Sequence, residues 1–134
     1  MKTTRFLSGI IILLILLGIT GCSSGYKAYQ KGDYMRACIE AVNRLRNDPD
    51  KDKAKAALLN AYPLFVTNAT RQIETALQAG DPNSLERSIS LYDQLNRVAE
   101  EINHSPAALA LIPNPSQYYG EMRLAMNLVT EMSY

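Results

Sequence analysis

Pairs of a capping residue and a proline recur along this chain, and they constrain its fold more than any other feature. There are four of them: Asp48-Pro49, Asp81-Pro82, Ser105-Pro106 and Asn114-Pro115. Proline suits the first position of a helix because its missing N–H would have no partner there. The Asp, Ser or Asn before it can accept hydrogen bonds from the next free N–H groups. Gly32-Asp33 predicts a fifth boundary, with Asp33 as the cap.

The segments between these boundaries carry apolar residues at the three- and four-residue spacing of amphipathic helices. This spacing predicts helices over residues 26–31, 34–47, 49–79, 83–103 and 116–133, with a short helical turn followed by a loop within 105–115. Nothing reads as a strand of useful length. We therefore expect an all-α fold of antiparallel helical hairpins.

Each of the longer predicted helices has one apolar face that we expect to be buried. These faces are Tyr34, Ala37, Cys38, Ala41, Val42 and Leu45; then Ala54, Ala57, Leu58, Ala61, Tyr62, Phe65, Ala69, Ile73, Ala76 and Leu77; then Leu85, Ile89, Tyr92, Leu95, Ala99 and Ile102; and last Tyr118, Met122, Ala125, Val129 and Met132. Cys38 is accordingly interpreted as a buried structural thiol. Because the second face keeps its phase across Pro63, we predict one long helix with a kink there, although that proline costs the hydrogen bond to the Leu59 carbonyl. A break into two helices at Pro63 is the alternative.

The N-terminus has the three-part layout of a secretory signal peptide. Lys2 and Arg5 form a short basic region, residues 6–17 are almost wholly apolar, and Gly18 and Gly21 break the run near its end. A membrane-spanning helix needs about 20 apolar residues, and this run is shorter. An uncleaved membrane anchor is the alternative interpretation.

The junction Ile19-Thr20-Gly21-Cys22 resembles the lipobox of bacterial lipoproteins, which consists of an aliphatic residue, a small residue, Gly and Cys. The resemblance implies cleavage between Gly21 and Cys22, with Cys22 carrying a thioether-linked diacylglycerol and an amide-linked acyl chain. It covers about the first 22 residues. Two or more acyl chains hold a protein firmly on a membrane, whereas one anchors it only marginally. The alternative for Cys22 is a disulfide with Cys38.

This resemblance divides the chain into a signal peptide (1–21), a lipidated tether (22–25) and a helical domain (26–134). In lipoproteins of the enterobacterial type an Asp after the lipidated Cys signals retention in the inner membrane. Ser23 stands at that place, which implies an outer-membrane anchor with the domain facing the periplasm.

The net charge limits the choice of partner. Removing residues 1–21 takes Lys2 and Arg5 from the 14 basic residues and leaves 12 against 13 acidic ones. A nearly neutral domain argues against nucleic acid as a partner. It also argues against a polybasic membrane patch, so the lipid would provide the membrane contact.

The first part of the domain resembles the second half of a tetratricopeptide repeat (TPR). In that repeat a Gly-Asp-Tyr turn joins two helices, a small Ala packs at their crossing and a Pro ends the unit. Gly32-Asp33-Tyr34, Ala37 and Pro49 occupy these places, and a weaker echo begins at Gly80-Asp81. The chain departs from the repeat at Arg44, where a second Ala is usual, and in the length of the 49–79 helix. A small helical bundle that shares the turn chemistry is the alternative.

No constellation of residues predicts catalysis, a metal or a cofactor. The single histidine, His104, stands at a predicted helix end and is interpreted as a C-terminal cap. Asp48, Asp50 and Asp52 alternate as in a calcium loop, but Pro49 and the intervening lysines do not fit that loop. We therefore expect a protein that is not an enzyme, with no cofactor and no metal site.

The candidate contact residues are tyrosines and a rigid loop. Tyrosine is favoured at interfaces because it combines a large apolar body with a polar tip. The candidates are Tyr26 and Tyr29 near the anchor, and Pro113, Asn114, Tyr118 and Tyr119 around the Pro-Asn-Pro loop. The alternative is that most of these tyrosines pack in the core or cover helix ends.

Together these features predict a non-enzymatic lipoprotein whose helical domain binds another envelope protein, as an assembly factor or accessory subunit of an export or cell-wall complex. The alternative is a ligand-binding lipoprotein that holds a peptide, a glycan strand or a lipid between its helices.

Overall fold

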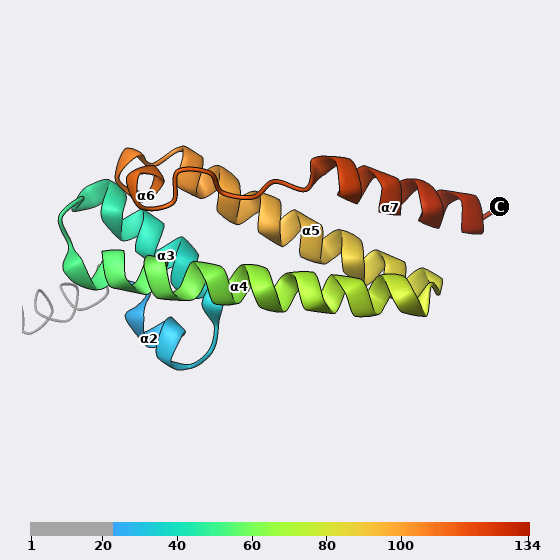
Figure 1. Ribbon diagram of the computed structural model, residues 1–134, viewed down its shortest axis with the longest axis horizontal. Helices are drawn as coiled ribbons and strands as arrows, with labels where there is room; N and C mark the ends of the chain where they lie inside the picture. The colour runs from blue at the N-terminus through green and yellow to red at the C-terminus, as the bar shows by residue number, and fades with distance from the viewer. Residues whose placement is uncertain (1–22) are drawn as a thin grey trace, which may run out of the picture.

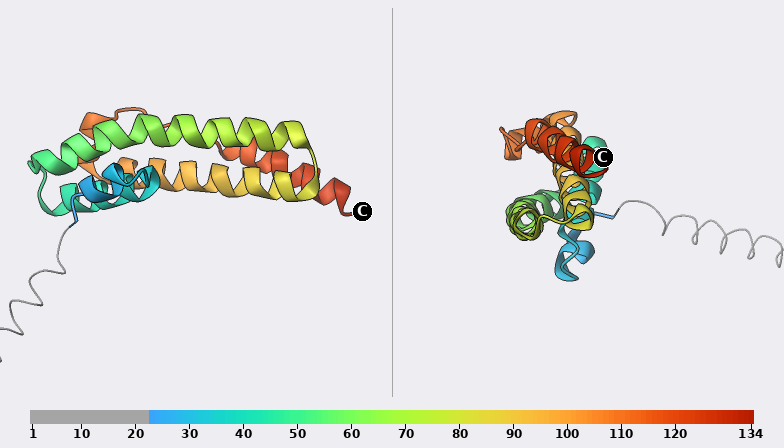
Figure 2. Two further views of the ribbon diagram at one scale, coloured as in Figure 1. Left: turned by 90° about the horizontal axis from the view of Figure 1, so that it is seen from below. Right: turned by 90° about the vertical axis from the view of Figure 1, so that its right-hand side faces the viewer.

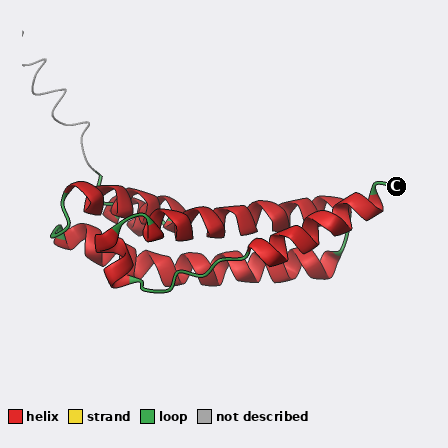
Figure 3. Cartoon of the chain, turned by 90° about the horizontal axis from the view of Figure 1, so that it is seen from above, coloured by secondary structure: helices red, strands yellow, loops and turns green. Residues whose placement is uncertain are grey.

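The computed structural model describes residues 23–134, so the predicted signal peptide and Cys22 lie outside the described residues. Throughout this part of the chain the regular elements are helices, as Figures 1 and 3 show. They are α2 (Tyr26–Gln30), α3 (Tyr34–Asn47), α4 (Asp52–Ala79), α5 (Pro82–Asn103), α6 (Pro106–Leu111) and α7 (Tyr119–Met132). The expected all-α fold is confirmed, including the short helix within 105–115.

Helices α4 and α5 form a long antiparallel hairpin (Figure 1). At the end where α4 begins and α5 ends, α3 and α6 pack against the hairpin, and α2 lies against α3 and α4. Helix α7 returns along another side of α5. Within the described chain α7 contacts α5 alone and does not touch α4 (Figure 2). The two ends of the molecule are therefore packed differently: several helices meet at one end, and α7 has a single neighbour.

Three of the five predicted caps are confirmed. Each accepts a hydrogen bond from the backbone N–H three residues later, which satisfies a donor that the helix itself leaves unpaired. The donor–acceptor pairs are Arg36 to Asp33 at 3.2 Å, Ser84 to Asp81 at 3.0 Å, and Ala108 to Ser105 at 3.3 Å. Hydrogen bonds from the Ser84 hydroxyl and N–H also lower the pKa of Asp81.

The predicted cap at Asp48 is wrong. The Asp48 N–H donates to the Arg44 carbonyl at 2.8 Å and so ends α3, while α4 begins at Asp52 rather than at Pro49. Between the two helices the Lys51 N–H donates to the Asp48 carbonyl at 3.2 Å and closes a turn. An Asp-Pro pair fits such a turn as well as it fits a helix start.

The predicted helix start at Asn114-Pro115 is also wrong, because residues 112–118 form a non-helical segment and α7 begins at Tyr119. Two of its backbone N–H groups are bound by side chains of other helices. Ser116 donates to the Tyr62 hydroxyl of α4 at 2.9 Å, and Tyr118 donates to Oδ1 of Asn96 in α5 at 2.6 Å. Both N–H groups therefore have acceptors although the segment is not helical, and those acceptors lie far from it in the sequence.

Helix α4 is continuous through Pro63, as predicted, and the alternative of two helices is wrong. Pro63 lies on the exposed side of α4, and Leu59 is also exposed. The Leu59 carbonyl that loses its intrahelical partner therefore lies where water can bind it, which makes the proline tolerable.

The core is built largely from alanines that allow helices to approach closely, with a few large side chains between them. The largest fully buried apolar side chains are Leu45, Leu58, Leu95, Ile102, Val42 and Val98. Most of the predicted inward faces are confirmed, but Leu77 and Met132 are 39% and 50% exposed. Leu77 lies in the last turn of α4, which packs only on the start of α5. Met132 lies in the last turn of α7, which runs past the end of the hairpin (Figure 1).

Candidate interaction surfaces

The tyrosines near the N-terminus form a row. The ring centroids of Tyr26 and Tyr29 are 6.3 Å apart, and those of Tyr29 and Tyr34 are 6.0 Å apart. Tilted pairs at this separation are favourable for aromatic rings. Tyr29 and Tyr34 are partly buried against the core, whereas Tyr26 is more exposed. The two candidates Tyr26 and Tyr29 thus lie side by side, and Tyr34 extends the row towards the core.

Gly25 places this row against α3. Its backbone has φ +82°, and a Cβ at this position would lie 2.3 Å from the Ala37 carbonyl oxygen. Only glycine combines that backbone conformation with so close an approach. Next to it, the Ser23 hydroxyl donates to the Glu40 carboxylate of α3. The first described residues are therefore held on the domain.

The segment 112–118 presents the other predicted contact residues. Pro113 and Asn114 are exposed. Tyr118 is half-buried, and its ring packs against that of Tyr92 in a tilted arrangement, with centroids 5.9 Å apart. The Tyr119 hydroxyl donates to the Glu100 carboxylate, and this hydrogen bond raises the pKa of Tyr119. The rigid loop is therefore exposed at Pro113 and Asn114, while Tyr118 packs on α5.

The structure does not bring all the predicted contact residues together. Tyr26 and Tyr29 lie on α2, which contacts α3 and α4, whereas residues 113–119 follow α6 along α5. Figure 1 and the end-on view in Figure 2 place these two groups on opposite sides of the α4–α5 hairpin. They form two surfaces rather than one.

The sequence interpretation missed an apolar surface on α7. Four large apolar side chains of this helix are 47–65% exposed: Leu124, Met126, Leu128 and Met132. Ala125 is its only buried residue. The sequence held one signal for this surface, since Leu124 and Leu128 are four residues apart yet fall outside the predicted inward face.

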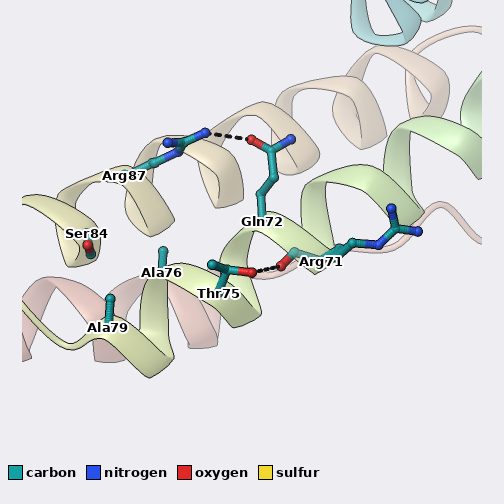
Figure 4. Close-up of a pocket in the computed structure, with 7 residues that line it drawn as sticks. All are labelled: Arg71, Gln72, Thr75, Ala76, Ala79, Ser84 and Arg87. Carbon is teal, nitrogen blue, oxygen red and sulfur yellow. Dashed lines mark hydrogen bonds between the residues drawn. The ribbon is translucent and has the colours of Figure 1, made fainter.

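A shallow cavity of about 240 Å³ lies between the second half of α4 and the start of α5 (Figure 4). It is lined by Arg71, Gln72, Thr75, Ala76, Ala79, Ser84 and Arg87. Arg87 donates to the Gln72 side chain at 3.0 Å, and the Thr75 hydroxyl donates to the Arg71 carbonyl at 3.0 Å. The two guanidinium groups lie apart (Figure 4), so they do not converge on one ligand atom. The volume of this cavity is below the range of about 300–1,000 Å³ that small-molecule sites usually enclose.

Cys38 and His104, the titratable residues singled out in the sequence, both have structural roles. Cys38 is fully buried, as predicted, and burial raises its pKa to about 12, so the thiol stays protonated. The His104 N–H caps the end of α5 by donating to the Glu100 carbonyl at 3.0 Å. Within residues 23–134 no three His, Cys, Asp or Glu side chains are grouped to hold a metal ion.

Comparison with protein-family models, with curated proteins and with solved structures finds no match to this chain. Among the described helices, none is long and apolar enough to cross a membrane.

Proposed function

We propose that this protein is a non-enzymatic, lipid-anchored scaffold that binds another protein of the bacterial envelope through α7. The observation that carries this proposal is the exposed apolar surface of α7. Monomeric proteins rarely expose contiguous apolar patches of more than a few hundred Å², and larger ones mark interaction sites. Leu124, Leu128 and Met132 follow one another at intervals of four residues, so they form one exposed apolar row on a helix that has one neighbour among the described helices.

The anchor is the lipobox-like junction Ile19-Thr20-Gly21-Cys22. We propose that Cys22 carries the acyl chains and that the domain faces the periplasm from the outer membrane. The contact of Ser23 with Glu40 supports a short connection, because it holds the residue after Cys22 against α3. Tethering raises the local concentration of the domain at the membrane, so a weak contact with a partner is still occupied.

The consecutive helix hairpins support a scaffold related in design to tetratricopeptide repeats, in which stacked hairpins provide extended surfaces for other proteins. The turn between α2 and α3 supports this part of the proposal, because Asp33 caps α3 and Gly32 has φ +79°. In this proposal the domain contributes shape and position within an assembly or export complex.

Photo-crosslinking in intact cells tests the proposal. A photoreactive amino acid at position 128 of the full-length protein is expected to yield one envelope protein crosslinked in stoichiometric amounts. The matched control is position 60, an exposed polar residue of α4. Absence of any adduct from position 128, or equal adducts from both positions, would contradict a binding role for α7.

A second candidate function is ligand binding in the cavity between α4 and α5. Its hydroxyl groups, arginines and alanine floor suit a small polar ligand such as a peptide or glycan fragment. A thermal-shift screen with cell-wall fragments, peptides and lipids separates the two functions, because a ligand that binds only the folded state raises the melting temperature. A shift abolished by Arg87→Ala but not by Leu128→Asp favours this candidate.

A further inference from the structure

The charges of this domain are divided between its two halves. Residues 23–80 carry nine Lys and Arg against six Asp and Glu, whereas residues 81–134 carry three against seven. Helices α5 and α7 belong to the second half, so the apolar surface of α7 lies in the acidic part of a nearly neutral domain. Charge of one sign around an apolar surface selects partners of the opposite sign.

On α7 the apolar row and the acids share a face. Leu124, Leu128 and Met132 follow one another at intervals of four residues and lie along one side of the helix. Glu121 precedes Leu124 by three residues and Glu131 follows Leu128 by three, so both carboxylates border this row.

The basic residues nearest to this row point elsewhere. Arg123 is adjacent to Leu124 in the sequence and is therefore turned about 100° away on the helix. On α5, Arg97 pairs with Asp93 at 3.4 Å, and Arg87 hydrogen-bonds Gln72 of α4. The charged side chains that border the row are therefore acidic.

We propose that this surface binds an amphipathic helix of the partner whose apolar stripe is flanked by lysines or arginines; this inference rests on the proposed scaffold function. The apolar stripe contacts Leu124, Leu128 and Met132, and the basic side chains reach Glu121 and Glu131. An amphipathic helix recognises such a surface through apolar residues at intervals of three and four. The row from Leu124 to Met132 spans about 12 Å at 1.5 Å per residue, or two turns of the partner helix.

A second copy of this chain is a poorer occupant. In a two-fold dimer the same patch of both copies forms the interface, so each residue of the patch faces a residue of the same patch in the other copy. Pairing the row with itself would bring Glu121 and Glu131 against the acids of the other copy, and opposed like charges are destabilising.

Two synthetic helical peptides of 14 residues test the inference. Both carry leucines at intervals of three and four; one carries lysine and the other glutamate at the flanking positions. Binding is measured to the full chain purified from membranes and held in phosphatidylcholine nanodiscs, with empty nanodiscs as the reference. We expect the lysine peptide to bind and the glutamate peptide not to bind.

Charge reversal provides the matched variants. Glu121→Lys with Glu131→Lys is expected to weaken binding of the lysine peptide at least tenfold and to allow the glutamate peptide to bind. Asp50→Lys with Asp52→Lys makes the same change in net charge at the other end of α4, and it is expected to leave both affinities unchanged. Equal effects of the two double variants, or no binding of the lysine peptide, would overturn the inference.

The outcomes separate this inference from the proposed function. If both peptides bind equally and Leu128→Asp abolishes binding, α7 is a docking surface but its partner is not basic. If crosslinks from position 128 join two copies of this chain, the occupant is a second copy and the inference is wrong. If neither peptide binds and position 128 gives no adduct, both the inference and the proposed function fail.

Discussion

Helix α7 and the α3–α4 region are both amphipathic, but they use their apolar side chains differently. In α3 the residues Ala37, Cys38, Ala41, Val42 and Leu45 are all fully buried, because α2, α4, α5 and α6 surround that helix. In α7 only Ala125 is buried. The comparison teaches that α7 carries more apolar surface than α5 can cover, which is unfavourable for an isolated monomer and suits a protein that docks.

The largest expected effect comes from a pair of identical truncations, one in each region. Leu58→Ala removes a fully buried side chain of α4 and is expected to destabilise the fold by about 2–5 kcal/mol. Leu124→Ala makes the same chemical change at a side chain that is 65% exposed, and is expected to change the stability by less than about 0.5 kcal/mol. Urea unfolding of both variants measures the difference, and similar losses would mean that α7 is part of the core.

The next effect concerns the hydrogen bond that links α5 to the start of α7. Asn96 is almost fully buried and accepts the Tyr118 N–H at 2.6 Å. Asn96→Ala leaves that donor unpaired and is expected to cost about 1–3 kcal/mol. Faster hydrogen exchange in α7 than in the unchanged protein, with exchange in α3 unaltered, is the predicted sign of a local loss. Asn103→Ala, at the exposed end of α5, is the control and is expected to leave α7 unchanged.

Two glycines sharpen the comparison at the N-terminal end. Both Gly25 and Gly32 have positive φ, but a Cβ at Gly32 would meet nothing within 4 Å. Gly32→Ala is therefore expected to cost about 1–2 kcal/mol of backbone strain alone. Gly25→Ala adds a clash with the Ala37 carbonyl and is expected to cost more and to release α2 from α3. Circular dichroism with urea unfolding measures both, and equal losses would show that the close approach is unimportant.

The smallest effect is a pH dependence from Cys38. Burial raises the pKa of this thiol from 9.0 to about 12 in the folded chain. Between these values the unfolded chain releases a proton that the folded chain retains, so stability falls as the pH rises above about 9. Below that pH both states are protonated and the contribution is constant. Cys38→Ala is expected to flatten this part of the stability curve, and an unchanged curve would contradict the account of the thiol.

The sequence predicted best those features that depend on neighbouring residues. Asp33, Asp81 and Ser105 cap helices because the N–H groups they accept lie three residues away. The pairs at Asp48 and Asn114 carry the same local pattern and were predicted wrongly. The outcome at Asn114 depends on Tyr62 and Asn96, side chains that lie far from it in the sequence.

The candidate site was harder to predict than the fold. The tyrosine row of α2 and α3 follows from residues close in the sequence, whereas the exposure of Leu124 and Leu128 depends on how many helices surround α7. Periodicity identifies an apolar face but does not indicate whether a neighbour covers it. Met132 shows this directly, since it falls on the predicted inward face but lies beyond the end of the hairpin.

Native-state hydrogen exchange, with and without the lysine peptide, tests the central claim most directly. Without the peptide, the amides of α7 are expected to exchange through local opening at a lower free energy than those of α3 and the buried part of α4. With the peptide, protection is expected to rise in α7 and to stay unchanged in α2. Exchange of α7 only with global unfolding, or peptide protection confined to other helices, would contradict the account.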